Sequence, residues 1–103
     1  VWNDTSPFDQ RELFVRVPVM AETHTWSASL TGAALLHSNQ TSTSLGCSRG
    51  CEALIDSGTS LLSAPTTVID GILAAMEALD ESCSNLDVLP ELTFHLAGHT
   101  FSL

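Results

Sequence analysis

The most informative stretch of the chain is residues 51–62, Cys-Glu-Ala-Leu-Ile-Asp-Ser-Gly-Thr-Ser-Leu-Leu. Apolar residues lead into Asp56 and return after the turn, which predicts a strand ending in a rigid, buried loop that carries one carboxylate. The hydroxyls of Ser57 and Thr59 lie within reach of the carboxylate, and Gly58 allows a backbone N–H to approach it closely. We therefore expect Asp56 to be oriented and partly desolvated.

A carboxylate of this kind can perform acid–base chemistry if a second carboxylate lies against it. Like-charge repulsion then makes the pair share one proton, so that one group is an acid and the other a base at the same site. The chain contains one Asp-Ser/Thr-Gly turn, at Asp56. The sequence therefore predicts half of a two-carboxylate site, and an aspartate that only caps its own turn is the competing interpretation.

Residues 50–62 and Pro65 closely resemble the second active-site motif of the pepsin-like aspartic proteases. The resemblance extends over nearly the whole chain, through residues 14–19, Trp26, residues 47–51 and residues 83–98. It implies a mainly β fold, with antiparallel sheets and one short helix after the catalytic loop. Residues 1–103 would then form part of the C-terminal lobe of a two-lobed enzyme. Coupled carboxylates are the chemistry of this family, so the resemblance implies the same two-carboxylate site.

The resemblance also implies an activity and a set of roles. It implies an aspartic endopeptidase that hydrolyses peptide or protein substrates with a water molecule activated by two aspartates. Asp56 would be one of them, and an N-terminal lobe of the same parent chain would supply the other. Thr59 would bond the outer oxygen of Asp56 and Gly58 the inner one. The hydroxyl of Ser57, which stands where the family usually has threonine, would tie the loop to its counterpart in the other lobe. Neither a cofactor nor a metal is implied.

The chain departs from the family pattern in several places. It has neither the Asp-Thr-Gly-Ser turn of an N-terminal lobe nor any tyrosine for a flap over the substrate. An apolar-apolar-Gly strand of the family is expected beyond Leu103. Two alternatives therefore stay open, and for the isolated 103 residues we expect no activity. In the first alternative, the chain is an inactive fragment or pseudoprotease that only binds a partner. In the second, it is a retroviral-type protease that dimerises through Asp56.

Charge and composition disfavour several classes of partner. Twelve acidic residues stand against three arginines and no lysine, a formal net charge of −9 at pH 7, which argues against nucleic acids and anionic membranes. No apolar run approaches the roughly 20 residues that span a bilayer, and the first residues do not resemble a secretory leader. Asn3-Asp4-Thr5 and Asn39-Gln40-Thr41 match the N-glycosylation pattern. They fit a secretory-pathway protein, either extracellular or in an acidic lysosome- or vacuole-like compartment.

The cysteines and histidines favour a disulfide over a metal site. Cys47 and Cys51 are separated by three residues that include Gly50, and we predict that they are paired. Zinc is the competing interpretation, but it needs about four ligands and no second cysteine pair exists. Cys83 is left over, and the resemblance implies a partner beyond Leu103. The four histidines fall in separate segments without a carboxylate pattern, so we predict no metal site. They are His24, His37, His95 and His99.

Alternation predicts strands in the first half of the chain. Residues 15–19 alternate valine with other residues, and Pro18 places this strand at an edge because proline cannot donate to the ladder. Residues 26–30 alternate again, with Trp26 expected in the core or in packing between lobes. Residues 37–48 are rich in Ser, Thr and Asn, so we expect an exposed loop without a chemical role.

The second half of the chain predicts one helix and one hairpin. The helix follows Pro65, with a capping box formed by Thr67 and Asp70. Apolar residues recur at helical spacing on one face of this helix. The residues of this face are Ile69, Ile72, Leu73, Met76 and Leu79. Alternation over residues 92–96, followed by Ala-Gly at 97–98, predicts a C-terminal β-hairpin.

Overall fold

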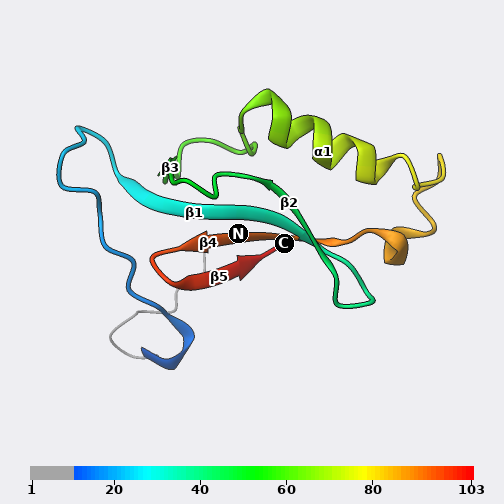
Figure 1. Ribbon diagram of the computed structural model, residues 1–103, viewed down its shortest axis with the longest axis horizontal. Coiled ribbons are helices and arrows are strands. Elements are labelled where there is room, and N and C mark those ends of the chain that lie inside the picture. Colours follow the sequence, from blue (N-terminus) through cyan, green and yellow to red (C-terminus); the bar gives the residue numbers. More distant parts are fainter. Residues whose placement is uncertain (1–10) are drawn as a thin grey trace.

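Antiparallel pairing around one long strand organises the chain in the computed structural model, which describes residues 11–103. Five strands form one sheet in the order β2-β1-β4-β5, with β3 also paired to β1. One α-helix and two short 3-10 helices are the other elements within these residues (Figure 1). In chain order the elements are η1 (Arg11–Leu13), β1 (Ser27–Leu36), β2 (Ser42–Gly46), β3 (Cys51–Leu54), α1 (Thr66–Met76), η2 (Leu86–Val88), β4 (Glu91–Leu96) and β5 (His99–Ser102).

β1 is the central strand because it pairs along both of its edges. β4 occupies one edge, between Leu30 and Leu36. β3 and β2 follow one another along the other edge, β3 opposite Ser27–Leu30 and β2 opposite Ala33–Leu36. This order puts the loop after β3 at the start of β1 and the β1–β2 turn at its end (Figure 1).

The buried core of the described residues is small. Its apolar members are Ala28, Ala33, Ala34, Leu35 and Val68. The helix α1 packs against β2, where a Cβ added to Gly71 would lie 2.5 Å from Cδ2 of Leu45. Glycine therefore lets the helix come close to the strand. Thr93 is buried beside this core and donates its hydroxyl to the carbonyl of Ala34 at 3.2 Å.

The predicted fold class is confirmed. The chain is mainly antiparallel sheet, with one short helix after the Asp56 loop, as the resemblance implied. The alternation at residues 26–30 belongs to β1, and the C-terminal hairpin is β4–β5. The predicted capping box is wrong. The helix begins at Thr66 with Pro65 as its N-cap, so Thr67 already lies in the first turn and no side chain caps the helix.

Three other predictions from local pattern are corrected. Residues 14–19 form no strand, and the backbone next makes a hydrogen bond at Met20, whose N–H donates to Ser27 O at 2.8 Å. Residues 37–48 are not all loop, since β2 lies within them; its polar side chains face outward while its backbone pairs with β1. Trp26 is not in the core of the described residues, because 74% of its surface is exposed; its other expected place, in packing between lobes, stays a prediction.

Candidate active site

Asp56 follows the strand β3 directly, and its position is set by the pairing of β3 with β1. Ser27 lies opposite Leu54, and one further backbone bond runs from Ile55 N–H to Trp26 O at 2.8 Å. Asp56 is the first residue beyond this pairing. The start of the loop is therefore held by the sheet.

Both carboxylate oxygens of Asp56 accept hydrogen bonds from its own loop. The Gly58 N–H donates to Oδ1 at 2.9 Å, and the Thr59 hydroxyl donates to Oδ2 at 2.5 Å. These bonds, the Thr59 hydroxyl first and the Gly58 N–H second, lower the pKa of Asp56 below its ordinary value. A Cβ added to Gly58 would lie 3.2 Å from Oδ1, so glycine gives this N–H its close approach. The orientation expected from the sequence is present.

The expected burial of Asp56 is wrong for the part of the chain that the structure describes. Asp56 is exposed, and so is every residue from Ile55 to Ser63. The apolar residues on both sides of the turn are exposed with it: Ile55 by 58%, Leu61 by 80% and Leu62 by 53%. Because this loop is open to water among residues 11–103, desolvation, which acts to raise the pKa of Asp56, is the smallest of the causes that act on it. The hydrogen bonds from Thr59 and Gly58 outweigh it, so the pKa is lowered.

Ser57 is exposed as well, and its hydroxyl makes no hydrogen bond to residues 11–103. Its two neighbours in the turn bond Asp56, whereas Ser57 is available to a group outside the described residues. Its predicted bond across a lobe interface is therefore left open.

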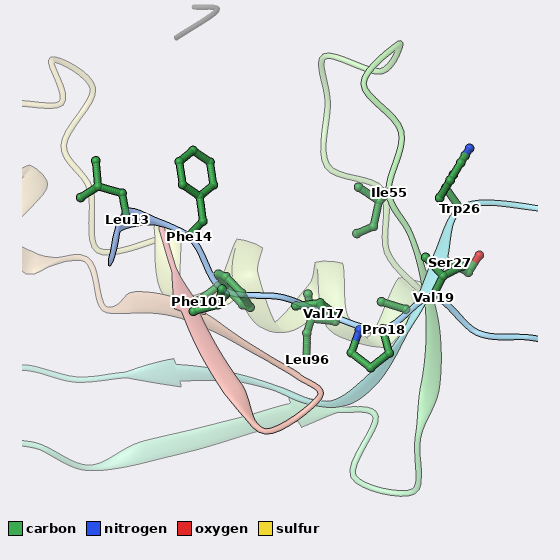
Figure 2. Close-up of a pocket in the computed structure, with 12 residues that line it drawn as sticks. Leu13, Phe14, Val17, Pro18, Val19, Trp26, Ser27, Ile55, Leu96 and Phe101 are labelled. Atoms are coloured by element: carbon green, nitrogen blue, oxygen red, sulfur yellow. The ribbon is translucent and has the colours of Figure 1, made fainter. Parts of the chain in front are cut away.

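Two apolar grooves meet at this loop. One, of about 590 Å³, has Asp56 and Thr59 in its wall together with apolar side chains of β1, β3, β4 and α1. The other, of about 490 Å³, lies under residues 13–19. Figure 2 shows this extended segment running past Phe101 and Leu96 towards Trp26 and Ile55. Ile55 lines both grooves, so the residue just before Asp56 stands between two unfilled apolar surfaces.

A hydrogen-bond cluster that the sequence interpretation missed joins β1 to β3 close to the loop. Ser27, which is 1% exposed, donates its hydroxyl to Oε1 of Glu52 at 2.7 Å. The Thr25 hydroxyl lies 2.7 Å from that of Ser27 and 3.3 Å from the same Glu52 oxygen. No local sequence signal marks this cluster, because the register of β1 and β3 brings together Ser27 and Glu52, which are 25 positions apart. The cluster fixes the strand that carries Asp56 to its neighbour.

The predicted disulfide between Cys47 and Cys51 is present, with an S–S distance of 2.08 Å and a Cα–Cα distance of 5.3 Å. Cys47 has a φ of 64° and Gly50 a φ of 95°, which turn the chain tightly between β2 and β3. Cys83 is exposed and has no disulfide partner among the described residues. The disulfide therefore anchors the first residue of the strand that leads to Asp56.

Residues 11–103 contain neither a cluster of metal ligands nor a helix suited to crossing a membrane. Residues 11–103 contain no group of three or more His, Cys, Asp or Glu that could hold a metal ion. His37 and His95 each hydrogen-bond a threonine hydroxyl, Thr43 at 2.9 Å and Thr100 at 3.0 Å. Within the same residues, no helix has both the length and the apolar character needed to cross a bilayer.

Comparison with known proteins agrees with this geometry. Residues 7–103 match the family described as eukaryotic aspartyl protease. Mouse renin-2 is 31% identical over 91 residues, 82% of this chain and 21% of the relative. Bovine pepsin A is 42% identical over 62 residues, which cover 53% of this chain and 17% of the relative. Chicken pepsin A is 31% identical over 90 residues, which cover 84% of this chain and 23% of the relative. The chain thus spans about a fifth of the length of these relatives. It belongs to the eukaryotic aspartyl protease family, the pepsin-like aspartic proteases.

Proposed function

We propose that residues 1–103 are part of the C-terminal lobe of a two-lobed aspartic endopeptidase and that Asp56 is one of its two catalytic carboxylates. The observation that carries the proposal is the position of Asp56. Its carboxylate directly follows the backbone pairing of β3 with β1, is held through both oxygens by Gly58 and Thr59, and lies in the wall of an apolar groove. Membership of the aspartyl protease family supports the same assignment.

The chemistry needs the second carboxylate, which we assign to an N-terminal lobe of the same parent chain. Each oxygen of Asp56 uses one lone pair on its loop donor, which leaves acceptor capacity directed away from the loop. A water molecule held between two carboxylates that share one proton loses a proton to the charged one as it attacks the peptide carbonyl. The protonated one donates to the carbonyl oxygen. No metal and no covalent intermediate enter this sequence of steps.

The exposed apolar residues around the loop support a covering lobe. Trp26, Ile55 and Leu61 are each more than half exposed. Ile55 and Leu61 line the same groove as Asp56, and Trp26 lines the second groove with Ile55. Covering them would remove water from Asp56 and add a like charge beside it, and both changes raise the pKa of one carboxyl of the pair. The reaction then runs on the acid side, where one proton is present in the pair. In this arrangement the Ser57 hydroxyl bonds the counterpart loop.

The substrate we propose is a peptide or protein in the secretory pathway, outside the cell or in an acidic lysosome- or vacuole-like compartment. Two sequons and a formal net charge of −9 support this placement. Nucleic acid is not a proposed partner.

The test is cleavage of a denatured protein at acid pH by residues 1–103 alone and by the complete two-lobed parent chain. We expect no cleavage by the isolated residues. The two-lobed chain should cleave, a statine-type transition-state inhibitor should block it, and Asp56→Ala should abolish it.

Each other outcome selects a different function. Inhibitor-sensitive cleavage by the isolated residues that is lost in Asp56→Ala would establish the self-dimerising, retroviral-type alternative. A folded two-lobed chain that cleaves nothing would leave a pseudoprotease that binds partners through its apolar face. Cleavage that survives Asp56→Ala would remove the proposed role of Asp56.

A further inference from the structure

The turn between β1 and β2 carries the sequon Asn39-Gln40-Thr41. His37 N–H donates to Thr41 O at 2.8 Å, and Gln40 N–H donates to His37 O at 3.0 Å. Gln40 has a φ of 68°, so the chain reverses sharply at this residue. The sequon is therefore part of a closed, ordered turn at one end of the hairpin (Figure 1).

Within this turn the two ends of the Asn39 side chain differ. Its Oδ1 accepts the Thr41 N–H at 3.1 Å and the Thr41 hydroxyl at 2.5 Å, an Asx-type turn that brings the hydroxyl of the sequon to the amide. Its Nδ2 donates to nothing within residues 11–103. Residues 38–41 are all exposed. The amide nitrogen is thus the unused end of an ordered, accessible side chain.

A second asparagine in the chain gives a contrast. Asn85 accepts the Asp80 N–H at Oδ1, at 2.9 Å, and donates its Nδ2 to Ala78 O at 3.0 Å. Both ends of that amide are occupied, and the sequence after it, Leu86-Asp87, supplies no hydroxyl at the second position. The features needed by an acceptor amide come together at Asn39 and not at Asn85.

We propose that Asn39 is an N-glycosylation site of this protein. Nδ2 attacks the anomeric carbon of an oligosaccharide carried on a lipid diphosphate. The new C–N bond forms as the C–O bond to phosphate breaks; the lipid diphosphate leaves with the electron pair, and Nδ2 gives up one proton to a base of the transferring enzyme. No oxidant or reductant is needed. The proposal rests on passage through the secretory pathway and does not depend on proteolytic activity.

The location leaves room for a glycan and keeps it away from Asp56. Ser42 to Ser44, which follow the turn, are exposed along β2. Leu36 pairs with Ser42 at this end of β1, whereas Ser27 pairs with Leu54 at the other end, two residues before Asp56. Nine steps along a strand span about 30 Å. A glycan on Asn39 therefore does not obstruct the groove beside Asp56.

The experiment uses residues 1–103 fused to a cleavable secretory leader and translated with endoplasmic-reticulum microsomes. Asn3→Gln is present throughout to remove the other sequon, which lies outside the described residues. Only molecules that have lost the leader and resist added protease are scored, so every scored molecule has met the transferase. A glycosidase that cleaves the Asn-linked sugar then reports the modification as a loss of mass.

We expect the scored molecules to carry one glycan at Asn39. Asn39→Gln and Thr41→Ala should abolish it, and Thr41→Ser, which keeps the hydroxyl, should retain it. Asn85→Gln is the matched control and should change nothing. Translocated molecules without a glycan would overturn the proposal, and so would a glycan that persists in Asn39→Gln.

Discussion

Two aspartates in this chain, Asp56 and Asp80, are held in nearly the same way by the residues that follow them. Asp56 accepts the Gly58 N–H and the Thr59 hydroxyl. Asp80 accepts the N–H and hydroxyl of Ser84 and, at 3.0 Å, the hydroxyl of Ser82. In both cases hydroxyl and backbone donors lower the pKa of the carboxyl. Hydrogen bonding within the loop does not distinguish them.

Their surroundings do distinguish them. The Asp80 loop closes on itself beyond α1, because Asn85 bonds both the Asp80 N–H and the Ala78 carbonyl. Asp56 instead lies two residues after β3, in the wall of one apolar groove, and its neighbour Ile55 also lines the other. A carboxylate that only caps a turn needs no such surface, whereas one that meets a second lobe and a substrate does. Asp56 therefore differs from Asp80 in its environment rather than in its hydrogen bonds, and this environment supports the catalytic assignment.

The largest expected difference between the two loops is in catalysis. In the two-lobed chain, Asp56→Asn should lower the rate of peptide cleavage by at least about 100-fold, because it removes an acid–base group. Asp80→Asn should leave the rate within about twofold. The measurement is kcat/KM on one peptide at acid pH. Equal losses in the two variants would erase the distinction between the loops.

The second difference is the Cys47–Cys51 disulfide, which holds the first residue of the strand that leads to Asp56. Replacing Cys47 and Cys51 by serine should lower the free energy of unfolding by about 2 kcal/mol, since the disulfide closes a five-residue loop in the unfolded chain. Denaturant titration measures it, with Ser48→Ala, an exposed residue inside the same loop, as the control that should have little effect. If Ser48→Ala destabilises as much as the double variant, the effect does not come from the disulfide.

A smaller effect is expected at the hydrogen-bond cluster below the Asp56 loop. Ser27→Ala should lower the free energy of unfolding by about 1 kcal/mol, because it removes a nearly buried hydroxyl that donates to Glu52. Ser29→Ala is the matched control, being exposed on the same strand opposite Glu52. Thermal or denaturant unfolding compares the two, and equal effects would contradict the role assigned to the cluster.

The smallest expected effects are on the pKa values of Asp56 and Asp80, which should change independently. Thr59→Val should raise the pKa of Asp56 towards its ordinary 3.8 and leave Asp80 unchanged, and Ser84→Ala should do the reverse. Carboxyl carbon shifts followed by NMR against pH measure both groups in one sample. If either variant shifted the pKa of both aspartates, the Asp56 and Asp80 loops would not be independent of one another.

The lowered pKa values of Asp56 and Asp80 determine the direction in which the stability of the folded chain changes with pH. Both carboxyls have a lowered pKa in the folded chain, so their loop bonds stabilise it above the unfolded value of about 4. That contribution is lost as the pH falls through the folded pKa. Wild-type stability should therefore fall more steeply below about pH 4 than that of a chain carrying both Thr59→Val and Ser84→Ala.

Much of the fold could be predicted because it rests on local chemistry. The alternation that became β1, the helix after Pro65, the β4–β5 hairpin and the Cys47–Cys51 pair each follow from spacing within a few residues. The strand β2 could not be predicted, since its polar side chains conceal a backbone that pairs with β1. Residues 14–19 have the pattern of a strand but no pairing partner in the described chain.

In the candidate site, too, local contacts could be predicted from the sequence and contacts between distant residues could not. The orientation of Asp56 by Gly58 and Thr59 is a contact over two and three residues, so the sequence predicts it. The burial of Asp56 and of Trp26 depends on what covers them, and alternation specifies only which face a side chain occupies. The bond between Ser27 and Glu52 joins residues 25 positions apart, and register rather than pattern creates it.

The most direct test of the central claim is the affinity of a statine-type transition-state inhibitor for the two-lobed chain, measured by calorimetry for the wild type, Asp56→Asn and Asp80→Asn. Such inhibitors bind at least about 100-fold more tightly than substrates because they use the catalytic groups. We predict that Asp56→Asn loses about that factor and that Asp80→Asn keeps the wild-type affinity. Undiminished binding by a folded Asp56→Asn chain would contradict the assignment of Asp56 as a catalytic carboxylate.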